Sequence, residues 1–166
     1  MAEANLDAKI ASLAKTAESL NRASNSINTT LDTVEKKLVA AKIGLEVWLS
    51  GYLSPVMSSI MLEPHFHQIH GQVERSLQRQ LGFTKLNGKW CLAVRGIETN
   101  DGYFERDVNC LGMSEVVVEQ PIPLTQASRE ERIAALRLLP DLLEALEDKA
   151  ARAIQTIEEA TKLVSE

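Results

Sequence analysis

The fold is decided by residues 6–48, whose sequence is LDAKIASLAKTAESLNRASNSINTTLDTVEKKLVAAKIGLEVW. Apolar or small side chains recur here at alternating steps of four and three residues. This heptad spacing predicts one long helix that hides a continuous apolar stripe against another helix. At ~1.5 Å per residue the helix would run roughly 60 Å, longer than a small core requires. The N-terminal stripe consists of Leu6, Ile10, Leu13, Ala17, Leu20, Ser24, Ile27, Leu31, Val34, Leu38, Ala41, Leu45 and Trp48.

Residues 21–30, NRASNSINTT, are the weak part of this helix. Asn, Ser and Thr side chains compete with the helix for its own backbone groups. The stripe nevertheless keeps its register across them, so we expect a continuous helix. Ser24 lies on the stripe itself. A polar residue there either fixes the register of a partner helix or, being small, lets another helix cross closely.

A second long helix is predicted at the C-terminal end of the chain. Ser128 and Glu131 form a capping box at its start. Pro140 lies off the stripe and predicts a kink or a fresh helix start. The C-terminal stripe consists of Leu136, Leu139, Leu143, Leu146, Ala150, Ala153, Ile157, Ala160 and Val164.

The residues between the stripes predict a smaller mixed region. Pro64 begins a helix that runs to about Leu81, with Gly82 as its C-cap. Residues 83–86 and 89–97 then form a hairpin around the Asn87-Gly88 turn. Residues 103–110 return as a third strand, and residues 116–118 add an edge strand that ends at the prolines 121 and 123.

Together these elements predict an α+β fold that is mainly α-helical. We expect the long N- and C-terminal heptad helices to pack as an antiparallel stalk. A small central head would contain one or two helices and a three- to four-stranded antiparallel β-meander. The stalk helices cover residues 1–48 and 126–166, the head covers residues 49–125, and the three parts form one folding unit.

Two such stripes favour a non-enzymatic coiled-coil or helical-bundle protein that oligomerises or docks on a larger protein assembly. The expected partner is another copy of the chain, with a dimer favoured, or a helical protein. The predicted interface residues are Leu6, Ile10, Leu13, Leu20, Ile27, Leu31, Val34, Leu38, Leu143, Leu146, Ile157 and Val164.

The alternative is a small ligand- or metal-responsive regulator that uses residues 65–70. All three histidines of the chain, His65, His67 and His70, lie in this segment. Histidine is a common metal ligand. On the predicted helix, however, His67 and His70 share a face that His65 does not, and no nearby cysteine completes a set. We therefore assign no metal ligand and expect no cofactor.

The chain carries no catalytic motif that we recognise, so we expect no enzyme activity. The Gly-rich phosphate loops, the HExxH zinc motif and the GxSxG nucleophile motif are absent from the sequence. Cys91 and Cys110 fall in predicted strands, where small buried side chains are typical. Whether these two cysteines approach each other is not fixed by the sequence.

Charge and hydropathy exclude two further classes of partner. The net charge of −5 argues against nucleic acid, because binding to phosphates requires clustered Lys and Arg. The longest uncharged run, residues 47–62, is shorter than a membrane span and contains Gly, Ser and Pro. The N-terminal residues lack the features of a secretory signal, so we expect a cytoplasmic protein with free thiols.

Overall fold

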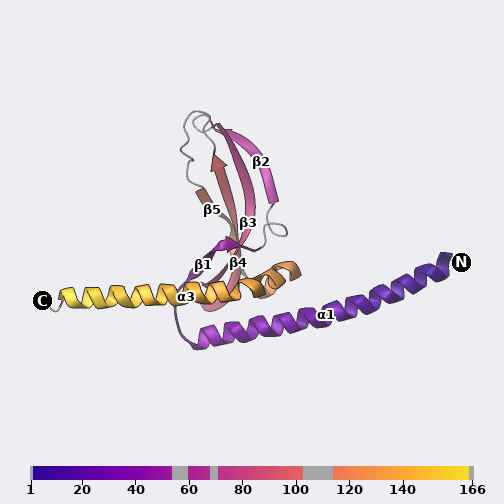
Figure 1. The fold of residues 1–166 in the computed structure, drawn as a ribbon, viewed down its shortest axis with the longest axis horizontal. Helices are drawn as coiled ribbons and strands as arrows, with labels where there is room; N and C mark the ends of the chain where they lie inside the picture. Colours follow the sequence, from indigo (N-terminus) through magenta and orange to yellow (C-terminus); the bar gives the residue numbers. More distant parts are fainter. Residues whose placement is uncertain (1, 54–59, 68–70, 103–113, 165–166) are drawn as a thin grey trace.

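The computed structural model describes residues 2–53, 60–67, 71–102 and 114–164, which form a mixed α+β fold (Figure 1). Its elements are, in chain order, α1 (Ala2–Ala40), β1 (Val47–Tyr52), β2 (Ile60–His67), β3 (Gly71–Leu86), β4 (Lys89–Gly102), β5 (Ser114–Pro123), the 3-10 turn η1 (Leu124–Gln126) and α3 (Arg129–Val164). The five strands form one antiparallel sheet in the order β1-β3-β4-β5, and β2 also pairs with β3. The predicted α+β class is confirmed. The sheet is larger than the predicted meander, and residues 49–125 contain no α-helix within their described part.

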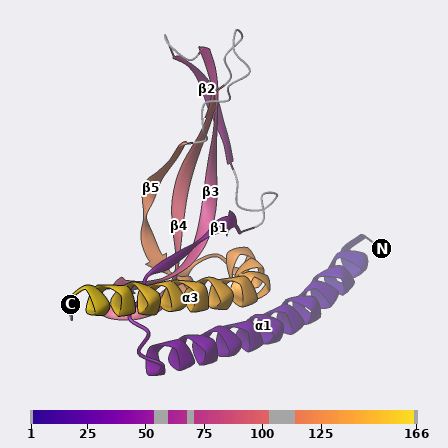
Figure 2. The ribbon, with the colours of Figure 1, turned by 60° about the vertical axis from the view of Figure 1, so that its left-hand side comes forward.

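The helices α1 and α3 lie side by side over part of their lengths and run in the same direction (Figures 1 and 2). At the start of α3, Arg129 Nη2 donates a hydrogen bond to Asn21 Oδ1 in the middle of α1 (3.0 Å). Further along both, Lys149 Nζ donates to the carbonyl oxygen of Glu46, just past the end of α1 (2.6 Å). The predicted antiparallel packing is wrong, because β5 and η1 return the chain to the middle of α1 before α3 begins.

The core lies where the sheet stands on the overlapping parts of the two helices (Figure 2). Glu35 of α1 also reaches β4, where its Oε2 accepts a hydrogen bond from the backbone N–H of Leu92 (2.8 Å). The sheet thus rests on both helices through one shared set of apolar contacts. The fully buried side chains of this core include Leu53, Leu81, Phe83, Leu92, Val94, Leu124, Leu142 and Leu146.

Helix α1 continues without a break through residues 21–30. The hydroxyls of Thr29 and Thr30 donate to the carbonyl oxygens of Asn25 and Ser26, four residues earlier. The hydroxyls therefore find hydrogen-bond acceptors within the helix, and the helix is not interrupted. Ser24 is 7% exposed, one turn from the residue that binds the start of α3. This position favours a small residue where α3 passes closely.

The prediction that the first helix extends to Trp48 is wrong, because α1 ends at Ala40. Lys42 and Gly44 then adopt positive φ angles of 52° and 64°, a conformation that stops a right-handed helix. The next residues alternate as a strand. Val47 and Leu49 are buried in the core, and Trp48 points to the other side of β1. The helical spacing of Leu45 and Trp48 is coincidental.

The predicted helix over residues 64–81 is also wrong, since these residues belong to β2 and β3. Strand β3 pairs with β4 without interruption from Val73 opposite Gly102 to Leu86 opposite Lys89. Residues 80–84 of β3 are all buried, because this central strand is covered on both faces. Alternation of apolar and polar residues is lost in such a strand. Gly82 is therefore a strand residue and not a helix C-cap.

The hairpin around Asn87-Gly88 is confirmed. Both residues have positive φ, 49° and 81°, as a type I′ turn requires. The predicted edge strand at residues 116–118 lies within β5, which ends at Pro123 and pairs only with β4 among the described strands. The predicted strand 103–110, including Cys110, lies outside the described residues.

The capping box at the start of α3 is confirmed. The Ser128 hydroxyl accepts a hydrogen bond from the Glu131 N–H (3.2 Å), and Glu131 Oε2 accepts one from the Ser128 N–H (2.8 Å). Glu131 also pairs with Arg79 of β3 (Oε1 to Nε, 3.0 Å). The cap thus ties the start of α3 to the sheet. Pro140 lies inside α3, with its side chain exposed, and the helix continues through it. The predicted fresh helix start at this residue is therefore wrong.

Candidate functional site

Each helix extends beyond the part that it shares with its neighbour, and the two extensions point to opposite ends of the molecule (Figure 1). We call residues 6–20 of α1 the N-arm and residues 154–163 of α3 the C-arm. The side chains of both segments are exposed throughout. The sheet stands over the overlap and over neither arm (Figures 1 and 2).

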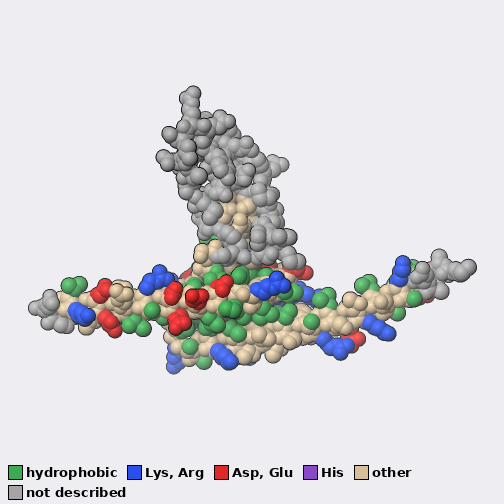
Figure 3. Space-filling view, viewed as in Figure 1, with side chains coloured by type: hydrophobic (Ala, Val, Ile, Leu, Met, Phe, Trp, Pro, Cys, Tyr) green, Lys and Arg blue, Asp and Glu red, His purple; other side chains and the backbone are tan. Residues whose placement is uncertain are grey.

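The arms carry large apolar side chains in water. Leu13 is 68% exposed and Ile157 is 65% exposed, whereas Leu31 and Leu146, on the same stripes, are 2% exposed. Figure 3 shows hydrophobic side chains spaced along both arms as well as between the helices. The N-terminal stripe is therefore covered in its middle and bare at one end. On the C-terminal stripe Leu139 and Leu146 are buried, whereas Leu143 and Ile157 are exposed. The exposed large apolar residues of the arms are Leu6, Ile10, Leu13, Leu20, Ile154, Ile157 and Leu163.

The other predicted interface residues have different surroundings. Leu31, Leu38 and Leu146 are buried in the chain's own core, and Ile27 and Val34 are half-buried against it. Leu143 is exposed on the overlapping part of α3. The side chain of Val164 lies outside the described residues. The buried stripe residues thus hold the chain together, whereas the stripe residues on the arms are exposed.

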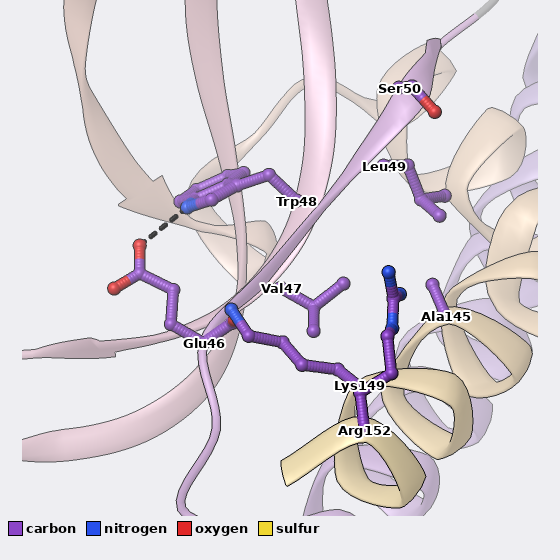
Figure 4. Close-up of a pocket in the computed structure, with 8 residues that line it drawn as sticks. All are labelled: Glu46, Val47, Trp48, Leu49, Ser50, Ala145, Lys149 and Arg152. Carbon is purple, nitrogen blue, oxygen red and sulfur yellow. Dashed lines mark hydrogen bonds between the residues drawn. The ribbon is translucent and has the colours of Figure 1, made fainter. Parts of the chain in front are cut away.

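A cavity of about 490 Å³ opens between β1 and the middle of α3 (Figure 4). In it Trp48 Nε1 donates a hydrogen bond to Glu46 Oε1 (2.6 Å), and Lys149 Nζ donates to the carbonyl oxygen of Glu46. Arg152 Nε donates to the carbonyl oxygen of Asp148 in its own helix (3.2 Å). The cavity is lined by Glu46, Val47, Trp48, Leu49, Ser50, Ala145, Lys149 and Arg152.

The described residues that line this cavity form no catalytic set that we recognise. Among them one hydroxyl, on Ser50, is present, and no histidine that could act as its base. The carboxylate of Glu46 is hydrogen-bonded to the indole of Trp48. Both cations are exposed surface residues. The cavity is best explained as the junction where β1 crosses α3, a site that the sequence did not indicate because its two parts lie about a hundred residues apart.

The alternative of a ligand- or metal-responsive regulator that uses residues 65–70 stays a prediction. His65 and His67 lie on β2, opposite Val73 and Gly71 of β3, so the helical argument about their faces does not apply. Their side chains, and all of His70, lie outside the described residues. Among the described residues, no three His, Cys, Asp or Glu side chains are grouped closely enough to hold a metal ion.

Cys91 is a half-buried free thiol on β4. Burial raises the pKa of this thiol, and the nearby carboxylate of Glu35 raises it further. A raised pKa keeps the thiol protonated near neutral pH and makes it a poor nucleophile. Whether Cys110 approaches Cys91 lies outside the described residues.

Comparisons with protein-family models, with curated proteins and with solved structures found no match to this chain. Neither α1 nor α3, the α-helices of the described residues, has a stretch long and apolar enough to cross a membrane.

Proposed function

We propose that the protein is a non-enzymatic interaction or scaffold protein whose two arms dock on other protein surfaces, either further copies of the chain or a helical partner. The observation that carries the proposal is the exposure of the stripe residues on the N-arm and the C-arm. Oligomerisation, a cytoplasmic location and the absence of enzyme activity are parts of the same proposal.

Helix stability supports this proposal. Most of the stability of a helix in a protein comes from the packing of its apolar face, and the side chains of both arms are exposed. The N-arm also leads into the Asn-, Ser- and Thr-rich segment, which adds little intrinsic helix propensity. The arms are therefore expected to be stable helices chiefly when a partner covers their stripes.

The energetic gain from such cover is substantial. Burying one exposed Leu or Ile contributes ~1.5–3 kcal/mol. The four large residues of the N-arm stripe, Leu6, Ile10, Leu13 and Leu20, are each about half or more exposed. Because about half of each side chain is already covered, burying the rest of all four would contribute roughly 3–6 kcal/mol, which reaches the lower part of the ~4–15 kcal/mol that association costs in lost freedom of motion.

The test compares the full-length protein with Leu13→Glu, which puts a charge on the N-arm stripe. Ala8→Glu is the matched control, since residue 8 is exposed on the opposite side of the same arm. Each tagged protein is incubated with its native extract and with an untagged copy of itself. We expect wild type and Ala8→Glu to retain partners, in either sample, that Leu13→Glu loses. Equal retention by all three proteins would contradict the proposal.

A further inference from the structure

The cavity between β1 and α3 lies along an edge of the sheet. Among the described strands β1 pairs only with β3, and its other edge faces α3 (Figure 4). One wall of the cavity is the continuous segment 46–50, and the other is one face of α3 that carries Ala145, Lys149 and Arg152. At about 3.3 Å per residue the strand wall is roughly 16 Å long. The cavity, which we call the β1–α3 groove, therefore suits an extended occupant.

Backbone groups of β1 point into this groove. The carbonyl oxygen of Val47 lies toward β3, close to Gly82, whereas the carbonyl oxygen of Glu46 accepts a hydrogen bond from Lys149 Nζ across the groove. Successive residues of a strand turn their backbone groups to opposite edges, so the N–H and C=O of Trp48 also face α3. No described strand pairs with this edge. Such an edge can hydrogen-bond the main chain of an added strand.

The β1–α3 groove also carries positive charge that the chain does not use. Arg152 Nε donates to the carbonyl oxygen of Asp148, but the two Nη atoms of Arg152 bind no described residue, and they carry four of the five guanidinium N–H groups. The ammonium of Lys149 has three donors and spends one on Glu46. Glu46, the one carboxylate among the described lining residues, already accepts from Trp48. Acidic groups of an occupant would therefore meet donors that lack a partner.

We propose that the β1–α3 groove binds an extended acidic peptide segment of a partner protein as an added strand beside β1. In Figure 4 the side chains of Lys149 and Arg152 extend from α3 in different directions, so their charged ends are well apart. A small anion can bond to one of them, whereas an extended segment with several carboxylates can meet both. The groove includes no residue of the N-arm or the C-arm, so it can bind a peptide whether or not the arms dock on a partner.

The test selects short linear peptides from a random library on the full-length protein. The selected peptides are then titrated with wild type, Arg152→Glu and Arg137→Glu. Both substitutions reverse one charge at an exposed position of α3, but residue 137 is not among the described lining residues. We expect the selected peptides to be enriched in Asp and Glu, to bind Arg137→Glu within about twofold of wild type, and to bind Arg152→Glu at least about tenfold more weakly.

Strand addition has a readout of its own. Two methylated versions of a selected peptide are made, with N-methyl groups on its odd-numbered or on its even-numbered residues. Only one set of N–H groups faces β1, because the backbone groups of a strand alternate between its two edges. We expect one methylated version to lose at least about tenfold in affinity and the other to keep most of it. Free glutamate in large excess should leave the peptide bound, since it offers no strand.

Several results would overturn the proposal. A library that yields no binder, peptides without an excess of acidic residues, or equal affinity for wild type and Arg152→Glu would exclude an acidic peptide in this groove. Displacement by free glutamate, or equal affinity of the two methylated versions, would exclude an added strand. Leu13→Glu should bind the peptides as tightly as wild type, because the N-arm is not part of the groove. Loss of binding in Leu13→Glu would place the peptides on the N-arm instead.

Discussion

At the scale of single residues, several positions are explained by one close neighbour each. Gly82 on β3 lies under the indole ring of Trp48 on β1, and a Cβ at this position would lie 2.3 Å from Trp48 Cε3 and 2.7 Å from the carbonyl oxygen of Val47. Arg95 covers the ring of Trp48, with its guanidinium carbon 4.2 Å from the ring centre. The sequence indicated the Asn87-Gly88 turn and the Ser128 cap, because these signals are local. It misread Gly82, because a ring contributed by another strand leaves no local signal.

Gly82→Ala is therefore expected to destabilise the protein by about 1–3 kcal/mol, since the backbone carbonyl of Val47 cannot move aside as a flexible side chain would. Urea denaturation measures the effect. Lys85→Ala, at an exposed position of the same strand, is the control and should change the free energy of unfolding by about 0.5 kcal/mol or less. A change of that small size for Gly82→Ala would show that β1 does not pack on β3 as described.

Cys91 gives a prediction about pH. Burial, with a smaller contribution from Glu35, raises the pKa of its thiol, so it should react with iodoacetamide more slowly than a free cysteine from neutral to moderately alkaline pH. The measurement uses a Cys110→Ser background. Glu35→Gln keeps an acceptor for the Leu92 N–H but removes the charge, so it should lower the pKa only in part.

The same pKa shift affects stability with a definite sign. The unfolded thiol ionises at a lower pH than the folded one, so the favourable contribution is complete below the pKa of the unfolded thiol. It is lost as the pH rises through the folded pKa. Reaction of Cys91 as fast as that of free cysteine would contradict its placement on β4.

At the scale of elements, the sequence indicated which residues are apolar and face a core better than it indicated where a helix ends or whether a segment is a helix or a strand. The N-terminal heptad pattern indicated an apolar stripe, but the helix ends at Ala40, where Lys42 and Gly44 adopt positive φ. The spacing of apolar residues over 64–81 suggested a helix. Long-range pairing with β4 decided otherwise, and no window of sequence contains that pairing.

At the start of α3 the side chain of Glu131 both caps the helix and pairs with Arg79 of β3. Substitutions that remove one or both of these interactions should therefore differ in their cost. Ser128→Ala removes one capping bond and should cost about 1 kcal/mol. Glu131→Ala removes the other capping bond and the pair with Arg79, whose side chain is 25% exposed, so it should cost more, about 2 kcal/mol. Glu131→Gln should lie between these values. Thermal denaturation of the three variants gives the order, and equal losses for Ser128→Ala and Glu131→Ala would argue against the link to β3.

At the scale of the whole molecule, the arrangement of the two helices determines what surface remains. The sequence predicted two apolar stripes, but the antiparallel packing predicted for them is wrong, because a heptad pattern does not indicate in which direction its partner helix runs. The sheet sets the meeting point: it returns the chain beside Asn21, so the helices run parallel and each keeps one bare end. The arms, and with them the candidate site, follow from this offset and could not be read from either stripe alone.

We expect the exposed stripes of the arms to be covered when the protein acts. Hydrogen–deuterium exchange of residues 6–20 in the full-length protein tests it directly, at dilute and at high concentration and with the native extract present. We predict that the N-arm amides exchange rapidly when dilute, become protected at high concentration or with the extract, and remain unprotected in Leu13→Glu. N-arm amides that stay unprotected under all these conditions, or that are equally protected in Leu13→Glu, would contradict the account.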